Sequence, residues 1–166
     1  MAQKMSWPWV WAVLLVLAAD QASKLAIEKM LPPDGFRVVI PGLFNLANTR
    51  NRGVAFGLLA DARQPWMSGA LVVFSCAVMI FLVWMLLAGR EEGTMAEWGM
   101  SLILGGAAGN ILDRMIHGSV TDFLDFYWRG LHWYTFNLAD TAIVTGAGLV
   151  LLGLFRDQRH PAEESA

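Results

Sequence analysis

The chain has little charge and almost no cysteine, and each shortage excludes a class of protein. Charged residues make up 16% of the 166 residues and hydrophobic residues 56%, whereas soluble domains average about a quarter charged. The single cysteine, Cys76, lies in an apolar run, so an internal disulfide is impossible and a packing role is expected. The net charge of −2, without a basic stripe, gives no reason to expect a nucleic-acid partner.

The chain also lacks the motifs of several hydrolytic mechanisms. His117, His132 and His160 are scattered and no HExxH occurs, so the sequence predicts no metal site. No GxSxG marks a serine nucleophile. Ser23 and Lys24 are adjacent, and neighbours on a helix point about 100° apart, which makes a poor dyad. Carboxylates are the remaining candidates for chemistry, and no cofactor is expected.

Long apolar runs predict a single membrane domain, residues 1–166, with an all-α fold of four spanning helices. These cover about residues 7–28, 66–88, 96–116 and 137–156. A hydrocarbon core of about 30 Å requires roughly 20 helical residues. The first run resembles a cleaved secretory signal, but the three apolar runs after it favour its retention as a span.

The polar ends of three spans are predicted to meet at one membrane face. Consecutive spans alternate in direction, so the C-terminal ends of the first and third and the N-terminal end of the fourth share a side. Ionisable residues at membrane depth are costly and mark a functional site. The residues at these ends are Asp20, Lys24, Asn110, Asp113, Arg114, Asn137 and Asp140. The positive-inside rule alone would place this face in the cytoplasm, because it carries most of the 12 Lys and Arg residues.

A small β-sheet is predicted outside the membrane, over about residues 36–60. Phe36–Ile40 is β-branched and aromatic, with Pro and Gly on both sides, which is typical of a short strand. Leu43–Ala47 and Val54–Leu59 are two further candidates, joined by a turn through Asn48–Gly53.

Aromatic residues are concentrated in residues 123–136, and this segment is predicted to lie at the level of the lipid headgroups. It either anchors the protein or forms a wall over the site. The remaining tail, residues 156–166, is polar and carries no functional signal.

Asp122 and Asp140 form the best candidate pair for catalysis. Two carboxylates that share a site cannot both ionise comfortably, so one can act as a base and the other as an acid. Two alternatives stay open. In the first, Asp140 only caps the fourth span, a favourable place for an acidic residue. In the second, Asp125 is the partner of Asp122.

Two pairs at i,i+4 spacing read as support for this site. Asp20 and Lys24 face the same way on a helix and can pair. Asn110 and Arg114 have the same spacing, and Arg114 can bind a carboxylate. The alternative for each pair is a structural ion pair or an anchor at the membrane interface.

Five short motifs, in order along nearly the whole chain, resemble those of bacterial lipoprotein signal peptidase, the type II signal peptidase. Together they are far more specific than any one alone. One small departure is Val54, where the family commonly has Ala. The motifs are Asp20-Gln-Ala-Ser-Lys24, Asn51-Arg-Gly-Val-Ala-Phe56, Gly105-Gly-Ala-Ala-Gly-Asn110 with Asp113-Arg114, Val120-Thr-Asp122-Phe123 and Phe136-Asn-Leu-Ala-Asp140.

The resemblance implies an inner-membrane aspartic protease with four spans and a small periplasmic sheet, which cuts prolipoproteins before a diacylglyceryl-modified cysteine. It implies Asp122 and Asp140 as the catalytic pair. It also implies a periplasmic site with both termini cytoplasmic, which opposes the charge count. The positions it assigns to shaping or supporting the site are Asp20, Lys24, Asn51, Gly106, Asn110, Arg114, Asn137 and Ala139.

The expected partners are the lipid-modified prolipoprotein, membrane lipids and a globomycin-type inhibitor, and the protein is expected to be a monomer. A transporter or channel component is the main alternative, because intramembrane charges often line ion paths. A structural subunit is the second. Against a transporter, the charges gather at one end of the spans and no internal repeat is present.

Overall fold

The computed structural model describes residues 8–53, 65–88 and 95–157, which form four helices and a four-stranded sheet. The helices begin and end within two residues of the ranges predicted for spans. They are α1 (Pro8–Met30), α2 (Pro65–Ala88), α3 (Met95–His117) and α4 (Leu138–Asp157). The strands are β1 (Phe36–Ile40), β2 (Phe44–Asn51), β3 (Val120–Trp128) and β4 (Leu131–His132).

Three helices of the described chain are long and apolar enough to cross a membrane, namely Pro8–Met30, Gly69–Ala88 and Leu138–Arg156. At 23 residues α3 is about 34 Å long, but it does not reach the same hydropathy. It is rich in glycine and carries polar residues at its C-terminal end. Because α3 contacts the other three helices, it is the central helix of the bundle.

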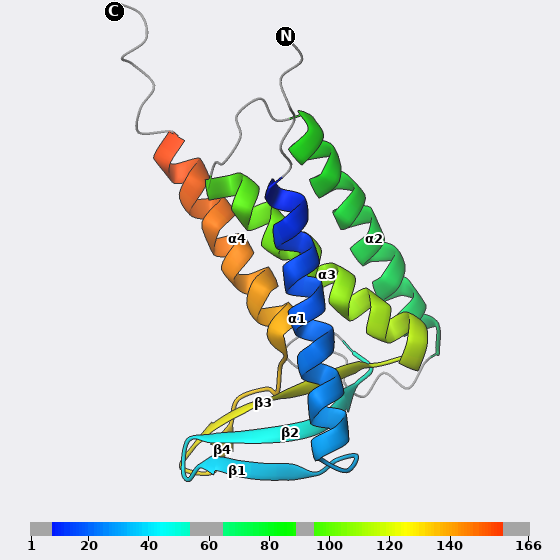
Figure 1. Cartoon of the computed structure of the whole chain (residues 1–166), viewed down its shortest axis with the longest axis vertical. Helices are drawn as coiled ribbons and strands as arrows, with labels where there is room; N and C mark the ends of the chain where they lie inside the picture. Colours follow the sequence, from blue (N-terminus) through cyan, green and yellow to red (C-terminus); the bar gives the residue numbers. More distant parts are fainter. Residues whose placement is uncertain (1–7, 54–64, 89–94, 158–166) are drawn as a thin grey trace, which may run out of the picture.

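The helices alternate in direction, so the three polar ends predicted to meet lie at the same end of the bundle. In Figure 1, α1 and α3 run toward the sheet, whereas α2 and α4 run away from it. The C-terminal ends of α1 and α3 and the N-terminal end of α4 therefore lie beside the sheet.

The sheet is antiparallel with the strand order β1-β2-β3-β4. The strand predicted over Phe36–Ile40 is confirmed with the same bounds. The turn predicted through Asn48–Gly53 is wrong, because β2 continues to Asn51 and pairs with β3 along its length, with a shift of register between Leu46 and Thr49. The predicted strand Val54–Leu59 lies outside the described residues, as does the tail beyond residue 157.

The aromatic segment, residues 123–136, contributes two strands that the sequence analysis did not predict. Its first part completes β3, and a two-residue turn at Arg129 and Gly130 leads into β4. Both turn residues have positive φ, 52° and 80°, which is the conformation of the hairpin turn whose twist matches that of the strands. The headgroup level of this segment stays a prediction.

Small residues let α3 approach α4 closely. A Cβ atom added to Gly99 would collide with the backbone oxygen of Gly146, and one added to Gly146 would collide with that of Gly99. Gly106 lies against the backbone oxygen of Ala139 in the same way, which is the packing that small residues permit between membrane helices. On α2, Cys76 is exposed, so the packing role expected for it is wrong.

The sheet is fastened to the end of α1 by an apolar cluster and by polar contacts. Ile27 and Leu31 are buried against Phe123 of β3. Glu28 accepts a hydrogen bond from the Thr121 hydroxyl at 2.8 Å and pairs with Arg50 of β2 at 3.0 Å. These contacts fix the start of β3 against the bundle, and with it the position of the next residue, Asp122.

Candidate active site

A buried lysine links the polar ends of α1 and α3. The Lys24 ammonium lies 2.7 Å from the Asp20 carboxylate and 2.9 Å from that of Asp113. It also donates to Asn110 Oδ1 at 3.1 Å. The ion pair predicted from the spacing of Asp20 and Lys24 is therefore present, and it has partners on a second helix.

The N-terminal end of α4 is held by two side chains. Asn137 precedes the helix, and its Oδ1 accepts a hydrogen bond from the Asp140 backbone N–H at 2.9 Å, as an N-cap does. The Ala139 backbone N–H donates to Asp20 Oδ1 at 3.0 Å, where a negative charge suits the positive end of the helix dipole. The capping role that was the alternative for Asp140 belongs to Asn137.

The Asp140 side chain is free for another role and faces the third helix. Its Oδ1 accepts a hydrogen bond from Asn110 Nδ2 at 2.8 Å. Because Asn110 Oδ1 is taken by Lys24, the amide of Asn110 cannot turn over without losing both contacts. The orientation of Asn110 therefore fixes the position of one Asp140 oxygen.

The Asp122 carboxylate is held by two asparagines and is 2% exposed. Asn137 Nδ2 donates to its Oδ1 at 2.6 Å, and Asn51 Nδ2 donates to its Oδ2 at 2.9 Å. Burial, and secondly the charge of Asp140, raise the pKa of Asp122 to about 7, against the opposing effect of the two asparagine hydrogen bonds. This carboxyl group can therefore carry a proton near neutral pH.

The sequence suggested that Arg114 can bind a carboxylate, but within the described chain it does not form such a contact. Its guanidinium donates to the backbone oxygens of Gly53 at 3.0 Å and Asn110 at 3.3 Å. Its buried Nε atom has no hydrogen-bond partner there. Arg114 thus ties the end of β2, where Asn51 lies, to the third helix.

Glycines make room for the site. A Cβ atom at Gly106 would lie 2.9 Å from Ile143 of α4, and one at Gly109 would collide with the Asp20 carboxylate. A side chain at Gly106 would push α3 away from α4, and one at Gly109 would push α3 away from α1. Either change would disturb the hydrogen bonds between these helices. The supporting role predicted for Gly106 is consistent with this packing, and Gly109 serves the same purpose.

Gln21 lies in one of the motifs but was given no role by the sequence, and Asp113 was placed at the polar helix ends without any partner being predicted for it. Asp113 accepts hydrogen bonds from Gln21 Nε2 at 3.0 Å and from the Thr121 backbone N–H at 3.2 Å. Asp113 therefore joins α1, α3 and the residue before Asp122. Its polar character at the end of the third span predicted its place in the cluster, but not its contacts with Gln21 and Thr121.

Asp125, the rival partner, lies in a different set of contacts. Its carboxylate accepts a hydrogen bond from Asn45 at 2.8 Å and lies 2.8 Å from His132 Nδ1. Neither neighbour belongs to the network that holds Asp122 and Asp140 in the described part of the chain.

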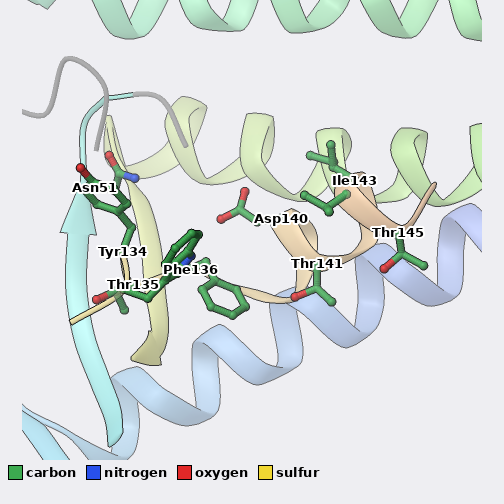
Figure 2. Close-up of a pocket in the computed structure, with 10 residues that line it drawn as sticks. Asn51, Tyr134, Thr135, Phe136, Asp140, Thr141, Ile143 and Thr145 are labelled. Atoms are coloured by element: carbon green, nitrogen blue, oxygen red, sulfur yellow. The ribbon is translucent and has the colours of Figure 1, made fainter. Parts of the chain in front are cut away.

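A cavity of about 390 Å³ opens beside Asp140. Figure 2 shows the Asp140 carboxylate between Asn51 and Tyr134 on one side and Ile143 of α4 on the other. The aromatic segment forms part of the wall through Trp133, Tyr134 and Phe136. Most of this wall is apolar, so the cavity suits an apolar or lipid-bearing ligand.

Comparisons with known proteins identify the family of this chain. The family described as Signal peptidase (SPase) II matches residues 12–156. The "Lipoprotein signal peptidase" of Solibacter usitatus is 46% identical to this chain, over 91% of this chain and 92% of the relative. The "Lipoprotein signal peptidase" of Aeromonas hydrophila is 42% identical, over 91% of this chain and 90% of the relative. A solved bacterial membrane enzyme superimposes with a TM-score of 0.83 at 26% identity, over 96% of this chain and 94% of its own. The chain therefore belongs to the signal peptidase II family.

Proposed function

We propose that the protein removes the signal peptide of diacylglyceryl-modified prolipoproteins by cutting immediately before the lipidated cysteine. The observation that carries this proposal is the meeting of two carboxylates, Asp122 and Asp140, in one hydrogen-bonded network beside a largely apolar cavity. The names of the relatives, which are lipoprotein signal peptidases, supply the substrate class.

Asp122 and Asp140 are the catalytic pair of an aspartic endopeptidase. Asp140 takes a proton from water, which attacks the carbonyl carbon, and Asp122 gives its proton to the carbonyl oxygen. Collapse of the tetrahedral intermediate breaks the C–N bond. The departing amine takes the proton that Asp140 holds, and a hydroxyl proton of the intermediate returns to Asp122. The raised pKa of Asp122 supports its role as the acid. This mechanism uses no metal and no cofactor.

The surrounding residues keep the two carboxylates in place. Asn137 contacts both aspartates, through a side-chain hydrogen bond to Asp122 and through the backbone of Asp140. Asn51 and Asn110 each hold one carboxylate oxygen. The remaining members, which orient these asparagines or the helix ends, are Asp20, Lys24, Gly106, Arg114 and Ala139.

The protein crosses the bacterial inner membrane four times, with both termini in the cytoplasm and the site near the periplasmic face. The length of α3, about 34 Å, supports a fourth span although its hydropathy is lower. A periplasmic site fits the substrate, because a lipidated cysteine lies at the outer interface. In this position the aromatic segment lies at the headgroups and also forms a wall of the site.

The protein is expected to work as a monomer, since Asp122, Asp140 and the asparagines that hold them all come from one chain. Its partners are the lipidated precursor and membrane lipids. A globomycin-type cyclic peptide is expected to inhibit it by occupying the cavity beside Asp140.

The proposal is tested with purified protein in detergent, without an ion gradient or a partner. A diacylglyceryl-modified prolipoprotein is expected to be cut before its cysteine, as mass spectrometry of the products would show. The same precursor without the lipid serves as the control and is expected to remain intact. Failure to cut the lipidated precursor would contradict the proposal and would favour the alternative interpretation, a transporter or channel component.

The cleavage rate is expected to depend on pH with a bell shape. Above about pH 7 the rate falls, because Asp122 loses the proton that it must donate. At acid pH the rate falls again, because the base becomes protonated. The measurement is kcat/KM for the lipidated precursor, which reports the ionisation of the free enzyme, from about pH 5 to about pH 9. A flat profile, under conditions where the chemical step limits the rate, would count against Asp122 as the acid and Asp140 as the base.

A further inference from the structure

A second hollow lies on the sheet, next to the cavity that holds Asp140. Its volume is about 450 Å³. Thr135 lines both hollows, so the two adjoin at that residue. The polar side chains that line the sheet hollow are Asp34, Asn45, Thr49, Asp125, His132 and Thr135.

One residue that lines this hollow, Asn45, has a buried acceptor without a donor among the described residues. Asn45 is 4% exposed, and its Nδ2 donates to the Asp125 carboxylate at 2.8 Å. No described residue donates to Asn45 Oδ1. Turning the amide over would place this oxygen against the carboxylate, so the orientation is fixed by charge. A buried oxygen without a donor is costly, and a ligand with an N–H group would satisfy it.

The other groups in the hollow also favour a cation. Asp34 and Asp125 provide carboxylates, and neither Lys nor Arg is among the described residues that line the hollow. His132 has its Nδ1 at 2.8 Å from Asp125. In the neutral ring with Nδ1–H donating to Asp125, Nε2 is an acceptor. Acceptors therefore dominate the lining, and a Lys or Arg side chain offers the matching donors and charge.

The position of the hollow indicates which part of a substrate reaches it. This step rests on the proposed function. The apolar signal segment must stay in the membrane beside α4, where Ile143 and Val144 line the first cavity. The segment of the substrate after the cleaved bond leaves the membrane. The sheet lies at the end of the bundle where α4 begins (Figure 1), which is where this segment would emerge. An extended segment passing Thr135 would enter the sheet hollow.

We propose that the hollow on the sheet is a binding subsite for a Lys or Arg side chain in the mature segment of the substrate, a few residues after the modified cysteine. It makes the enzyme prefer precursors with a cation at that position.

The test uses lipidated precursors that differ only in one residue, with Ala, Lys or Glu placed in turn at each of the first positions after the cysteine. With the wild-type enzyme, Lys at one position is expected to raise kcat/KM about tenfold over Ala, mainly through KM, as a charged hydrogen bond would. Asp125→Asn and Asp34→Asn are expected to lower this preference to within about twofold. The control, Glu97→Gln at the far end of α3, removes the same charge and should keep the preference.

Equal kcat/KM for Ala, Lys and Glu at every position would overturn the subsite, as would a preference that survives both substitutions. Asp34 is exposed, so Asp34→Asn decides the matter even if Asp125→Asn fails to fold. The proposed function has a separate readout. If the wild type cuts the Ala precursor without any preference, only the subsite fails, whereas no cleavage of any lipidated precursor means that the proposed function fails.

Discussion

Replacing either Asp122 or Asp140 with Asn is expected to abolish cleavage of a lipidated precursor without unfolding the protein. The loss should reach roughly 10²- to 10⁴-fold or more, the usual contribution of general acid–base catalysis. An amide can neither take a proton from water nor give one as a carboxylic acid does. The measurement is the single-turnover rate of the purified variants.

The structure allows both substitutions to keep the fold. In Asp140→Asn, the amide oxygen still accepts the hydrogen bond from Asn110 Nδ2. In Asp122→Asn, the new amide meets two donors, Asn51 and Asn137, so one neighbour must turn. We therefore expect a lower melting temperature for Asp122→Asn than for Asp140→Asn, with both variants folded.

The control for both substitutions is Glu97→Gln, which removes one carboxylate from the other end of α3 and should keep wild-type turnover. Inactive but folded Asp122 and Asp140 variants would support the pair. If Asp140→Asn retains activity, Asp140 is a structural member of the network, and Asp125 becomes the next partner to test.

Replacing Lys24 with Met is expected to destabilise the protein by about 3–5 kcal/mol, because it leaves buried carboxylates without their cation. Asp20 is fully buried and Lys24 is 3% exposed, so water cannot take the place of the ammonium. Met keeps much of the volume of the side chain, and the loss therefore reports on charge. Unfolding in detergent, followed by thermal melting and by denaturant, measures the effect.

Lys29→Met is the matched control, since Lys29 is exposed on the same helix. It should change the free energy of unfolding by no more than about 0.5 kcal/mol. Equal stability of the two variants would contradict a cluster that depends on its cation. Activity should fall in Lys24→Met as well, because Asn110 loses the contact that orients it toward Asp140.

The helices and the meeting of their polar ends could be predicted from the sequence. An apolar run marks each helix, although only the run over residues 66–88 is uncharged over the full length of a span. The alternation of directions brings Lys24, Asn110 and Asp140 to one end. This prediction needs only counting, because helix length and direction are local properties. The strand Phe36–Ile40 could also be predicted, since turn residues bound it on both sides.

The pairing of β2 with β3 could not be predicted in the same way. The residues Val120–Phe123 are all buried, so the alternation that marks a half-exposed strand is missing. Asp122 meets Asn51 only because the register shifts between Leu46 and Thr49. Such a shift depends on contacts between distant parts of the chain, and the sequence has no local sign of it.

The role of Asp113 was missed for a related reason. Its partners, Gln21 and Thr121, come from α1 and from the start of β3. A pattern within one helix shows that a polar residue faces inward, but not what it meets there. Three-dimensional packing was needed to show that Asp113 helps to position Asp122.

The order of the elements along the chain has a consequence for synthesis. Asp122, Asn137 and Asp140 all come from the last third of the given sequence, and α4 is made after the other described helices. A growing chain that ends before α4 has neither Asp140 nor the cap that orients it. If Asp122 and Asp140 are the catalytic pair, as proposed above, a growing chain cannot cleave a substrate until α4 has been made and has packed against the other described helices.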